Sequence, residues 1–216
     1  MTFENQLQVL LPDDLPHRAQ VASFSARHLD LIVEANKTLN LTRILDVREA
    51  AIKHVLDSVL PWKLFVGARV VVDAGTGAGL PGIPLSLVLP QTKFVLLESV
   101  QKKTRFVQSA IAALGLRNVE AIPLRAEDWL KYHHADIITA RAVAPLERAV
   151  PLFGPAIQEG SRALFYKGPE VQNEIETAMP ETRKRYLVAR EILRYELPDS
   201  LGTRTIVEVV RGNKDA

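Results

Sequence analysis

The chain has 216 residues, of which 47% are hydrophobic and 24% are charged, and its formal net charge at pH 7 is +2. This length and apolar content suit one globular domain with, at most, a small appendage. No run of residues approaches the roughly 18 uninterrupted apolar positions of a membrane span, and the first residues lack the order of a secretory signal. We therefore expect a cytoplasmic protein without membrane contact.

The chain contains no cysteine. This absence excludes disulfides, cysteine zinc sites, iron–sulfur clusters and every mechanism that uses a thiolate nucleophile. His54 and Asp57 lie three positions apart on one expected helix face, and we expect them to pair with each other, so no metal site is predicted. The small positive charge permits an anionic partner without demanding one.

The first part of the chain is predicted to be helical, from about residue 15 to residue 60. Apolar residues recur at steps of three and four between Val21 and Ala35 and mark one helix face, which also carries His28. Asp46 followed by Glu49 is typical of a helix start, and Pro61 ends that helix. Residues 1–66 are thus expected to form a helical extension packed on a core domain of residues 67–216. Asn36 and Asn40 are expected either to cap this extension or to brace it against the glycine loop.

From residue 69 onward, strand and helix patterns alternate. The strand candidates are 69–73, 93–98, 119–123, 136–140 and 163–167, and the helical patterns are 83–89, 102–114, 126–132, 146–157 and 171–179. This alternation predicts a parallel sheet covered on both faces. Residues 187–197 and 203–211 flank a turn and predict an antiparallel hairpin at the edge of a seven-stranded sheet. Residues 212–216 are expected to be a loose tail.

A glycine-rich loop follows the first of these strands. Asp73 ends the strand, Gly75, Gly77 and Gly79 follow, and an apolar helix begins directly afterwards. Glycine lets the backbone approach a ligand closely, and strand, loop and helix together predict a nucleotide-type site. Residues 77–82 also satisfy G-x-G-x-x-G, so an NAD-linked oxidoreductase is one candidate. The acid before the loop is better matched to S-adenosylmethionine, which carries a sulfonium and an ammonium but no phosphate.

Two further positions suit a nucleoside ligand. Glu98 ends the second strand about twenty residues beyond the loop, where a carboxylate can accept both ribose hydroxyls, a charged hydrogen bond worth roughly 1.5–3 kcal/mol. After the third strand, Ala126 and Glu127 are placed to offer adenine a backbone N–H and a side-chain acceptor. The alternative for Glu127 and Asp128 is that their charges complement the helix dipole.

With these positions placed, the chain resembles the RsmG (GidB) family of bacterial ribosomal RNA methyltransferases, which modify N7 of a guanosine in 16S rRNA. The resemblance runs from about Leu31 to Val210 and is carried by residues 36–44 (NKTLNLTRI), 54–58 (HVLDS), 73–85 (DAGTGAGLPGIPL), 139–144 (TARAVA) and 167–168 (KG). It implies a Rossmann-like α/β methyltransferase fold with a seven-stranded sheet. It also implies 16S rRNA or the small ribosomal subunit as partner, and S-adenosylmethionine held at Gly75, Leu80, Ala126, Glu127 and Arg141. Glu98 stands where many relatives have aspartate.

The chemistry agrees with this resemblance. Guanine N7 has a lone pair and no proton, so it attacks the methyl group without a general base, and alignment is the main task of the enzyme. The missing cysteine excludes pyrimidine C5 methylation through a cysteine adduct. Residues 140–142 (ARA) stand where methylation of exocyclic adenine amines calls for Asn/Asp-Pro-Pro-aromatic. The lysine–aspartate–lysine–glutamate arrangement of ribose methylation cannot be assembled.

Arg141 and Lys167 are the candidates for positioning the substrate. Arg141 ends the fourth strand, where ligands meet open α/β sheets, and its guanidinium can donate to the cofactor carboxylate or to guanine O6. The alternative is an ion pair with Asp136 or Glu147. Lys167 ends the fifth strand and either faces substrate or is a solvated lysine.

Several basic residues can contact RNA phosphates. Candidate phosphate ligands are Arg43, Lys53, Lys102, Lys103, Arg105 and the cluster 183–185, each of which also fits a solvated face. We expect a monomer. The alternative function is a non-catalytic RNA-binding or ribosome-assembly factor with a vestigial cofactor pocket.

Overall fold

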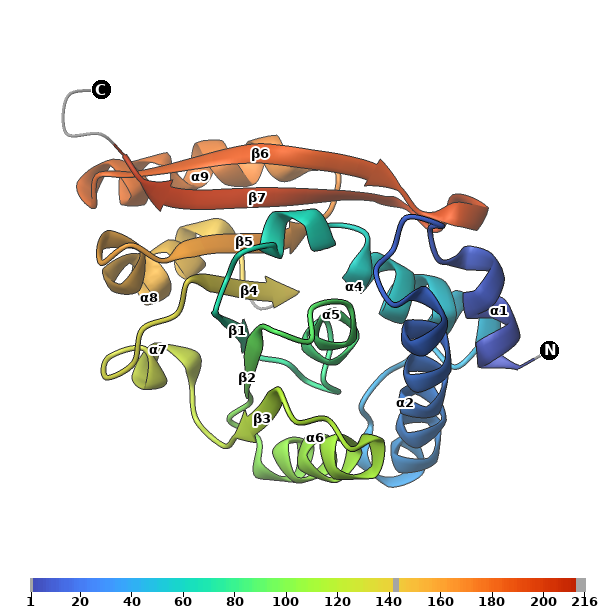
Figure 1. Cartoon of the computed structure of the whole chain (residues 1–216). Helices are drawn as coiled ribbons and strands as arrows, with labels where there is room; N and C mark the ends of the chain where they lie inside the picture. Colours follow the sequence, from blue (N-terminus) through green and yellow to red (C-terminus); the bar gives the residue numbers. More distant parts are fainter. Residues whose placement is uncertain (1, 142–143, 213–216) are drawn as a thin grey trace.

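A computed structural model describes residues 2–141 and 144–212. Its centre is one seven-stranded sheet in the order β3-β2-β1-β4-β5-β7-β6 (Figure 1). Strands β1 to β5 are parallel, and β7 runs antiparallel to both β5 and β6. The strand bounds are β1 Val70–Ala74, β2 Lys93–Leu97, β3 Val119–Ile122, β4 Ile137–Arg141, β5 Arg162–Lys167, β6 Leu187–Glu196 and β7 Thr203–Arg211. The predicted α/β fold with an antiparallel edge hairpin is confirmed.

Helices cover both faces of this sheet (Figure 1). The α-helices are α1 Phe3–Leu10, α2 Arg18–Leu39, α3 Val47–Ala50, α4 Asp57–Val59, α5 Gly82–Val88, α6 Gln101–Leu114, α7 Ala126–Trp129, α8 Leu146–Gln158 and α9 Val171–Lys184. A π-helix, η1, spans Ala51–Leu56, and two short 3₁₀ helices are η2 Trp62–Phe65 and η3 Pro198–Ser200. Alternate strand residues face the two layers, since Val71 packs with α1, α2, α5 and α6, and Val72 packs with α7, α8 and α9.

The N-terminal helices share a hydrophobic core with the sheet. Leu7 of α1, Leu29 of α2 and Ile52 of η1 belong to the same buried cluster as Val71 and Leu85. The division into an extension of residues 1–66 and a core domain of residues 67–216 stays a prediction. Helix α1 lies outside the predicted helical range: its two buried apolar residues, Phe3 and Leu7, are one turn apart, a pattern too short to mark a helix by periodicity.

The second predicted helix exists, but its interior is not α-helical. Asp46 accepts hydrogen bonds from the amides of Arg48 and Glu49 and so caps α3 as expected. Glu49 does not complete a capping box, because its side chain pairs with Lys53. The chain then continues as η1, and such π segments are frequent at functional sites. No periodicity in the sequence marks this change.

The ends of the elements agree with the predictions to within a few residues. Gly115 adopts φ 66° and caps α6, as helix-terminal glycines do. Helix α9 extends five residues beyond the predicted end at Met179, because Ala178 and Thr182 are buried on one face and carry it past Pro180. Of the expected loose tail, only Gly212 is described, and its amide donates to the Tyr186 carbonyl. Residues 213–216 lie outside the described part.

Candidate active site

The site lies where the strand order reverses. β1 is flanked by β2 on one side and β4 on the other, and Asp73 of β1 is the register partner of Thr139 of β4. In open α/β sheets, ligands bind at the carboxyl ends of the strands beside such a switch point. The glycine loop follows β1, and Arg141 is the last residue of β4. The fold therefore brings together two sequence motifs that are about sixty residues apart.

Asp73 holds the two ends of the glycine loop together. Oδ2 of Asp73 accepts the Thr76 hydroxyl at 2.6 Å and the Gly82 amide at 2.9 Å. Between Asp73 and Gly82, Gly75, Gly77 and Gly79 take φ values of 69°, 61° and 90°, a region that side chains rarely adopt. The carboxylate thus ties the start of the loop to the first residue of α5.

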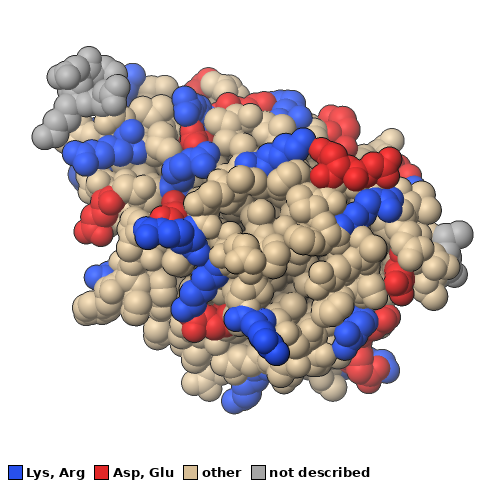
Figure 2. Space-filling view, viewed as in Figure 1, with Lys and Arg blue, Asp and Glu red and all other residues tan. Residues whose placement is uncertain are grey.

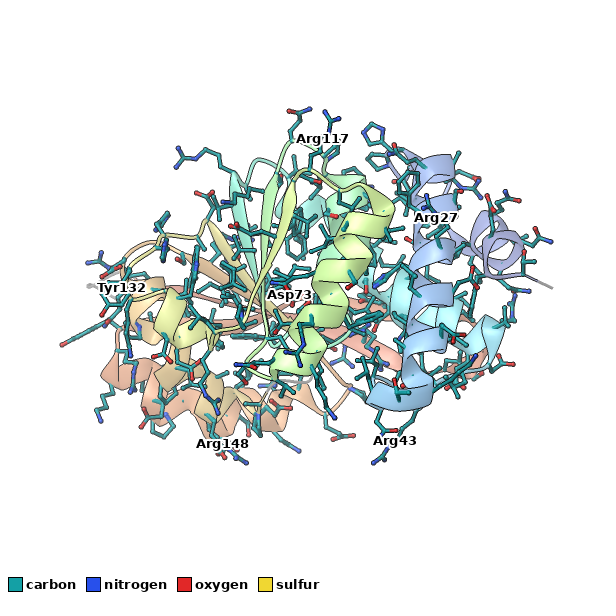
Figure 3. The ribbon with its side chains drawn as sticks, turned by 90° about the horizontal axis from the view of Figure 1, so that it is seen from below. Arg27, Arg43, Asp73, Arg117, Tyr132 and Arg148 are labelled. Atoms are coloured by element: carbon teal, nitrogen blue, oxygen red, sulfur yellow. The ribbon has the colours of Figure 1, made fainter. Side chains whose placement is uncertain are left out.

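Asp73 is completely buried, and Figure 3 shows it in the interior while Arg27 and Arg43 lie at the surface. Burial raises the pKa of Asp73 to about 6, against the opposing effect of the hydrogen bonds from Thr76 and Gly82. Oδ1 has no partner among the described atoms. The hydrogen bonds of Asp73 go to the loop itself, and its direct contact with a cofactor stays a prediction.

His28, on α2, supports the loop from the other side. Its Nε2 lies 2.8 Å from the Ala78 carbonyl oxygen, and the side chain is fully buried. Burial lowers the pKa of His28 to about 4, so the neutral ring donates from Nε2 at pH 7. The apolar pattern placed His28 on the buried face of its helix but gave no sign of its partner, which is 50 residues away.

Of the two roles expected for Asn36 and Asn40, capping is confirmed for Asn40, whereas the described hydrogen bonds of Asn36 do not brace the helices against the glycine loop. Asn36 instead exchanges two hydrogen bonds of 2.9 Å with the backbone of Thr42, which ties down the turn after α2. Asn40 caps α2 with φ 49°, a left-handed conformation that asparagine tolerates. Both residues shape the end of α2, and the contact with the glycine loop is made by His28.

Three other predicted cofactor residues lie at the neighbouring strand ends. Glu98 directly follows β2, is 8% exposed, and accepts the Val100 amide at 2.8 Å through Oε1. This leaves Oε2 for a ligand hydroxyl, whereas the sequence predicted that the whole carboxylate would accept both ribose hydroxyls. Ala126 and Glu127 begin α7 after β3, and the Glu127 carboxylate is 4.0 Å from Arg125. Their contact with a cofactor stays a prediction, as it does for Leu80.

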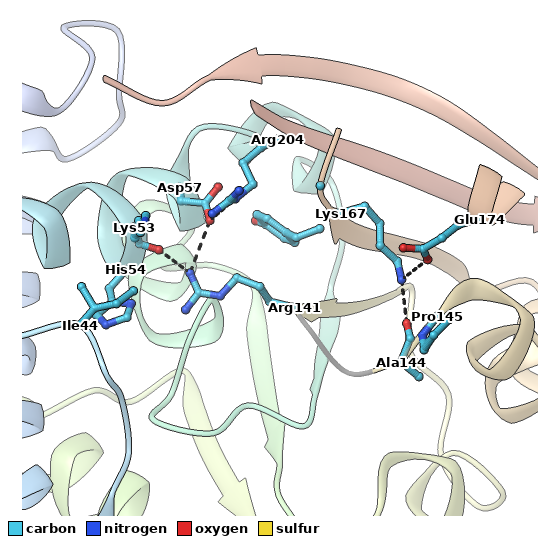
Figure 4. A pocket seen from close by; sticks show the side chains of 12 residues that line it. Ile44, Lys53, His54, Asp57, Arg141, Ala144, Pro145, Lys167, Glu174 and Arg204 are labelled. Carbon is cyan, nitrogen blue, oxygen red and sulfur yellow. Dashed lines mark hydrogen bonds and ion pairs between the residues drawn. The ribbon is translucent and has the colours of Figure 1, made fainter. Parts of the chain in front are cut away.

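A cavity of about 620 Å³ opens beside this loop at the carboxyl ends of β4 and β5 (Figure 4). Its wall also includes residues from η1, α4, α9 and β7. The lining residues are Ile44, Lys53, His54, Asp57, Arg141, Ala144, Pro145, Tyr166, Lys167, Gly168, Glu174 and Arg204. Four of these side chains are cationic and two are carboxylates, an excess that favours an anionic ligand.

Arg141 is held in this cavity by the N-terminal helices. Its Nη1 donates to the Lys53 carbonyl at 2.8 Å and lies 3.7 Å from Oδ2 of Asp57 (Figure 4). The predicted alternative, an ion pair with Asp136 or Glu147, is wrong. Asp136 lies at the opposite end of β4 and accepts the amides of Arg69 and Val70.

Asp57 connects several parts of the cavity wall. It is 1% exposed and accepts from Arg204 Nε at 3.2 Å and from the Tyr195 hydroxyl at 3.0 Å. The predicted pairing of His54 with Asp57 is wrong, because His54 Nε2 lies 3.0 Å from the Thr42 hydroxyl. Burial, and then the charge of Arg141, lower the pKa of His54 to about 3, so its ring is neutral at pH 7.

Lys167 is not a solvated lysine. Its Nζ donates to the Ala144 carbonyl and to Oε2 of Glu174, each at 2.7 Å, and the side chain is 11% exposed. The same Oε2 also accepts the Leu146 amide at 3.1 Å. Sequence reasoning missed Glu174, because nothing in the spacing of α9 distinguishes it from the other acids of that helix. Residues 142 and 143 of the 139–144 motif lie outside the described residues.

The face drawn in Figure 2 carries no continuous basic patch. Lys and Arg side chains there alternate with Asp and Glu and leave the middle of the face largely uncharged. Within the cluster 183–185, Arg185 pairs with Glu181. The roles of Arg43, Lys102, Lys103 and Arg105 stay predictions.

Comparison with known proteins identifies the family. A family model described as rRNA small subunit methyltransferase G (GidB) matches residues 22–199. The chain belongs to this family. It is 64% identical over 209 residues to ribosomal RNA small subunit methyltransferase G of Solibacter usitatus, covering 97% of this chain and all of that one. The Pelotomaculum thermopropionicum protein of the same name is 38% identical, covering 88% of this chain and 82% of that one.

Solved structures of low sequence identity share the fold. The O-methyltransferase TomG from Streptomyces achromogenes, in complex with S-adenosylmethionine, is 15% identical with a TM-score of 0.56, and the match covers 86% of this chain and 90% of that one. A mutant of MtNAS in complex with S-adenosylmethionine is 16% identical with a TM-score of 0.58, and the match covers 99% of this chain and 85% of that one. These matches confirm the methyltransferase-type fold that the family resemblance implied.

Two negative findings apply to the described residues. None of their helices combines the length and the apolar character needed to cross a bilayer. Nor do residues 2–141 and 144–212 gather three or more His, Asp or Glu side chains in a group fit to hold a metal ion.

Proposed function

We propose that this chain transfers a methyl group from S-adenosylmethionine to N7 of a guanine in small-subunit ribosomal RNA. One observation carries the proposal: a braced glycine loop at the end of β1 and a cation-rich cavity at the ends of β4 and β5 lie at the carboxyl ends of neighbouring strands, in a member of the rRNA small subunit methyltransferase G family. The loop suits the methyl donor, and the cavity suits a base and its phosphates.

The residues beside the loop fit S-adenosylmethionine. A side-chain carbon built on Gly77 would meet only the Gly75 carbonyl, at 4.0 Å, so the loop backbone is open to close approach by a ligand. Oε2 of Glu98 is free for a ribose hydroxyl, and Leu80, Ala126 and Glu127 are assigned to the same ligand. When bound, S-adenosylmethionine supplies the electrophilic methyl group.

The chain's own residues supply orientation. Guanine N7 is an acceptor without a proton, so no side chain has to remove one, and correct alignment of the reacting groups provides several kcal/mol of the barrier. Arg141 is fixed by the Lys53 carbonyl and Asp57, and Lys167 by the Ala144 carbonyl and Glu174. Each cation keeps further N–H donors for guanine O6, for a phosphate, or, at Arg141, for the carboxylate of the methyl donor.

The test is transfer of labelled methyl groups to small subunits that lack the modification, followed by borohydride–aniline cleavage, which cuts at N7-methylguanosine. We expect one cleavage site and its loss in Arg141→Gln, with Arg117→Gln, an exposed arginine remote from the cavity, as the matched control. Transfer without cleavage would refute the N7 assignment. RNA binding without transfer would instead support a non-catalytic assembly factor.

We further propose that the protein works in the cytoplasm as a monomer, with 16S rRNA or the small subunit as its macromolecular partner. The support for the RNA partner is the rRNA small subunit methyltransferase family to which the chain belongs and the excess of cationic side chains in the cavity. Sedimentation of the purified protein with and without small subunits tests both points. A stable dimer in the absence of RNA would contradict the monomer.

A further inference from the structure

The pair formed by Lys167 and Glu174 has an orientation that the transfer reaction by itself does not explain. Oε2 of Glu174 is committed to two donors, Lys167 Nζ at 2.7 Å and the Leu146 amide at 3.1 Å. No donor from residues 2–141 or 144–212 reaches Oε1, which Figure 4 draws on the side of the carboxylate that faces the cavity. The carboxylate is therefore fixed through one oxygen and presents the other to a ligand.

Lys167 is arranged in the same way. Two of its three N–H donors go to the Ala144 carbonyl and to Glu174, which leaves one for a ligand. With the side chain 11% exposed, the ammonium cannot rotate freely into solvent. Side by side on the cavity wall, the two residues thus offer one donor and, next to it, one acceptor.

This order of donor and acceptor matches guanine. On its Watson–Crick edge, guanine carries the O6 acceptor directly beside the N1–H donor, whereas adenine carries the 6-amino donor beside the N1 acceptor. We propose that Lys167 and Glu174 read this edge, with Lys167 donating to O6 and Oε1 of Glu174 accepting from N1–H. Adenine would place a donor against the ammonium and a lone pair against the carboxylate. Glu174 is then a specificity-determining residue.

This inference rests on the proposed function, because it requires a guanine target. It adds a reason for rejecting adenine, whose N7 is also an unprotonated ring nitrogen. A site built to hydrogen-bond a substrate discriminates against a base that lacks the matching groups. Here such a base leaves the Lys167 ammonium, whose side chain is 11% exposed, and the 36% exposed Glu174 carboxylate without their partners.

The first experiment uses the wild-type protein and rRNA that carries a single substituted nucleoside at the target position. Inosine keeps O6 and N1–H, 1-methylguanosine keeps O6 alone, and adenosine reverses both groups. We expect kcat/KM for inosine to lie within about tenfold of guanosine, and kcat/KM for 1-methylguanosine and adenosine to fall by about 100-fold or more. Methylation of 1-methylguanosine at the rate of guanosine would overturn the proposal without any variant.

The second experiment changes the protein. In Glu174→Gln, and in Glu174→Ala as a second variant, we expect the preference for guanosine over adenosine to shrink by about tenfold or more. Glu176→Gln is the matched control, an exposed acid on the same helix whose hydrogen-bond partner is Gln172. Calorimetry with S-adenosylmethionine checks that each variant is folded.

The outcomes separate the two proposals. If wild-type protein gives no N7-methylguanosine on the unsubstituted rRNA, the proposed function fails. If the wild type methylates N7 but both Glu174 variants lose activity on guanosine and adenosine in equal proportion, the function stands. Glu174 is then a structural residue that holds Lys167 and α8, and the reading of the guanine edge is refuted.

Discussion

The glycine loop and the cavity lie side by side at the end of one sheet, but different forces hold them. The loop is held by buried, short-range contacts, such as the Asp73 carboxylate on the Gly82 amide nine residues later, and by a neutral histidine. The cavity is held by charges from distant parts of the chain. Asp57 meets Arg204 across 147 residues, and Arg141 meets the Lys53 carbonyl across 88.

This difference suits the two ligands. A small cofactor binds to a preformed backbone. The conformational entropy of the loop is lost when the protein folds and is not lost again at each binding event. An RNA target brings phosphates and a base that must be oriented, which charged side chains with spare donors can do. Removing a support of the loop should therefore affect stability and cofactor binding. Removing a support of the cavity should mainly lower kcat/KM for the RNA substrate.

The largest expected effect is that of Gly82→Ala, which disturbs the packing under the glycine loop. A side-chain carbon there would lie 2.2 Å from Leu96 Cδ2 and 2.8 Å from Asp73 Oδ2, both fully buried. We expect the free energy of unfolding in urea to fall by about 3 kcal/mol, and the affinity for S-adenosylmethionine to fall by about 100-fold in calorimetry. Gly168→Ala, where the added carbon meets no described atom within 4 Å, is the control for stability. Equal stability of the two variants would contradict the tight packing under the loop.

The second prediction concerns the cavity wall, where Asp57 is replaced in Asp57→Asn. The change removes the buried charge that faces Arg204 and Arg141. Because both guanidinium groups keep some contact with water, we expect a loss of about 2 to 3 kcal/mol in unfolding free energy, below the usual range for breaking a buried pair. Measured kcat/KM for rRNA should fall by about tenfold or more, with cofactor affinity nearly unchanged. A parallel fall in cofactor affinity would instead assign Arg141 to the methyl donor.

The third prediction concerns Glu98, to which we assign the ribose hydroxyls of the cofactor. We expect Glu98→Ala to weaken binding of S-adenosylmethionine by about 10- to 100-fold, equivalent to ~1.4–2.8 kcal/mol. Glu98→Gln keeps an acceptor for the Val100 amide. It therefore separates the effect of the lost carboxylate–ribose contact from the effect of the lost hydrogen bond to Val100. Unchanged affinity in calorimetry would refute the ribose assignment.

The features that could be predicted from the sequence are those formed by residues close together in the chain. The buried strands and the glycine loop are local: β1 and β2 are runs of apolar residues, and Asp73 and Gly82 belong to one continuous motif. Their positions were predicted to within one residue. Arg141 and Lys167 were placed correctly at strand ends for the same reason, because parallel strands end at one edge of the sheet.

The partners of these residues were not predictable in the same way. Arg141 is oriented by Lys53 and Asp57, and His28 supports Ala78, through contacts between segments that only tertiary packing brings together. The sequence of the π-helix that presents the Lys53 carbonyl, AIKHVL, contains nothing that distinguishes it from an α-helix. Local alternatives such as a His54–Asp57 pair were wrong, since neighbours on a helix face turn to different partners once other elements cover them.

The last prediction concerns His28 and depends on pH. Burial lowers its pKa from 6.5 to about 4, so between these values the unfolded chain binds a proton that the folded protein does not. The stability of the protein should therefore fall as the pH falls through this window. From pH 7 to pH 5 this contribution amounts to about 2 kcal/mol. In His28→Gln, whose amide can still donate to the Ala78 carbonyl, it should vanish, whereas His134→Gln, at a half-exposed ring, should behave like the wild type. Urea unfolding at both pH values measures the difference. If His28→Gln and the wild type lose the same stability on acidification, His28 does not hold the loop as a buried neutral ring.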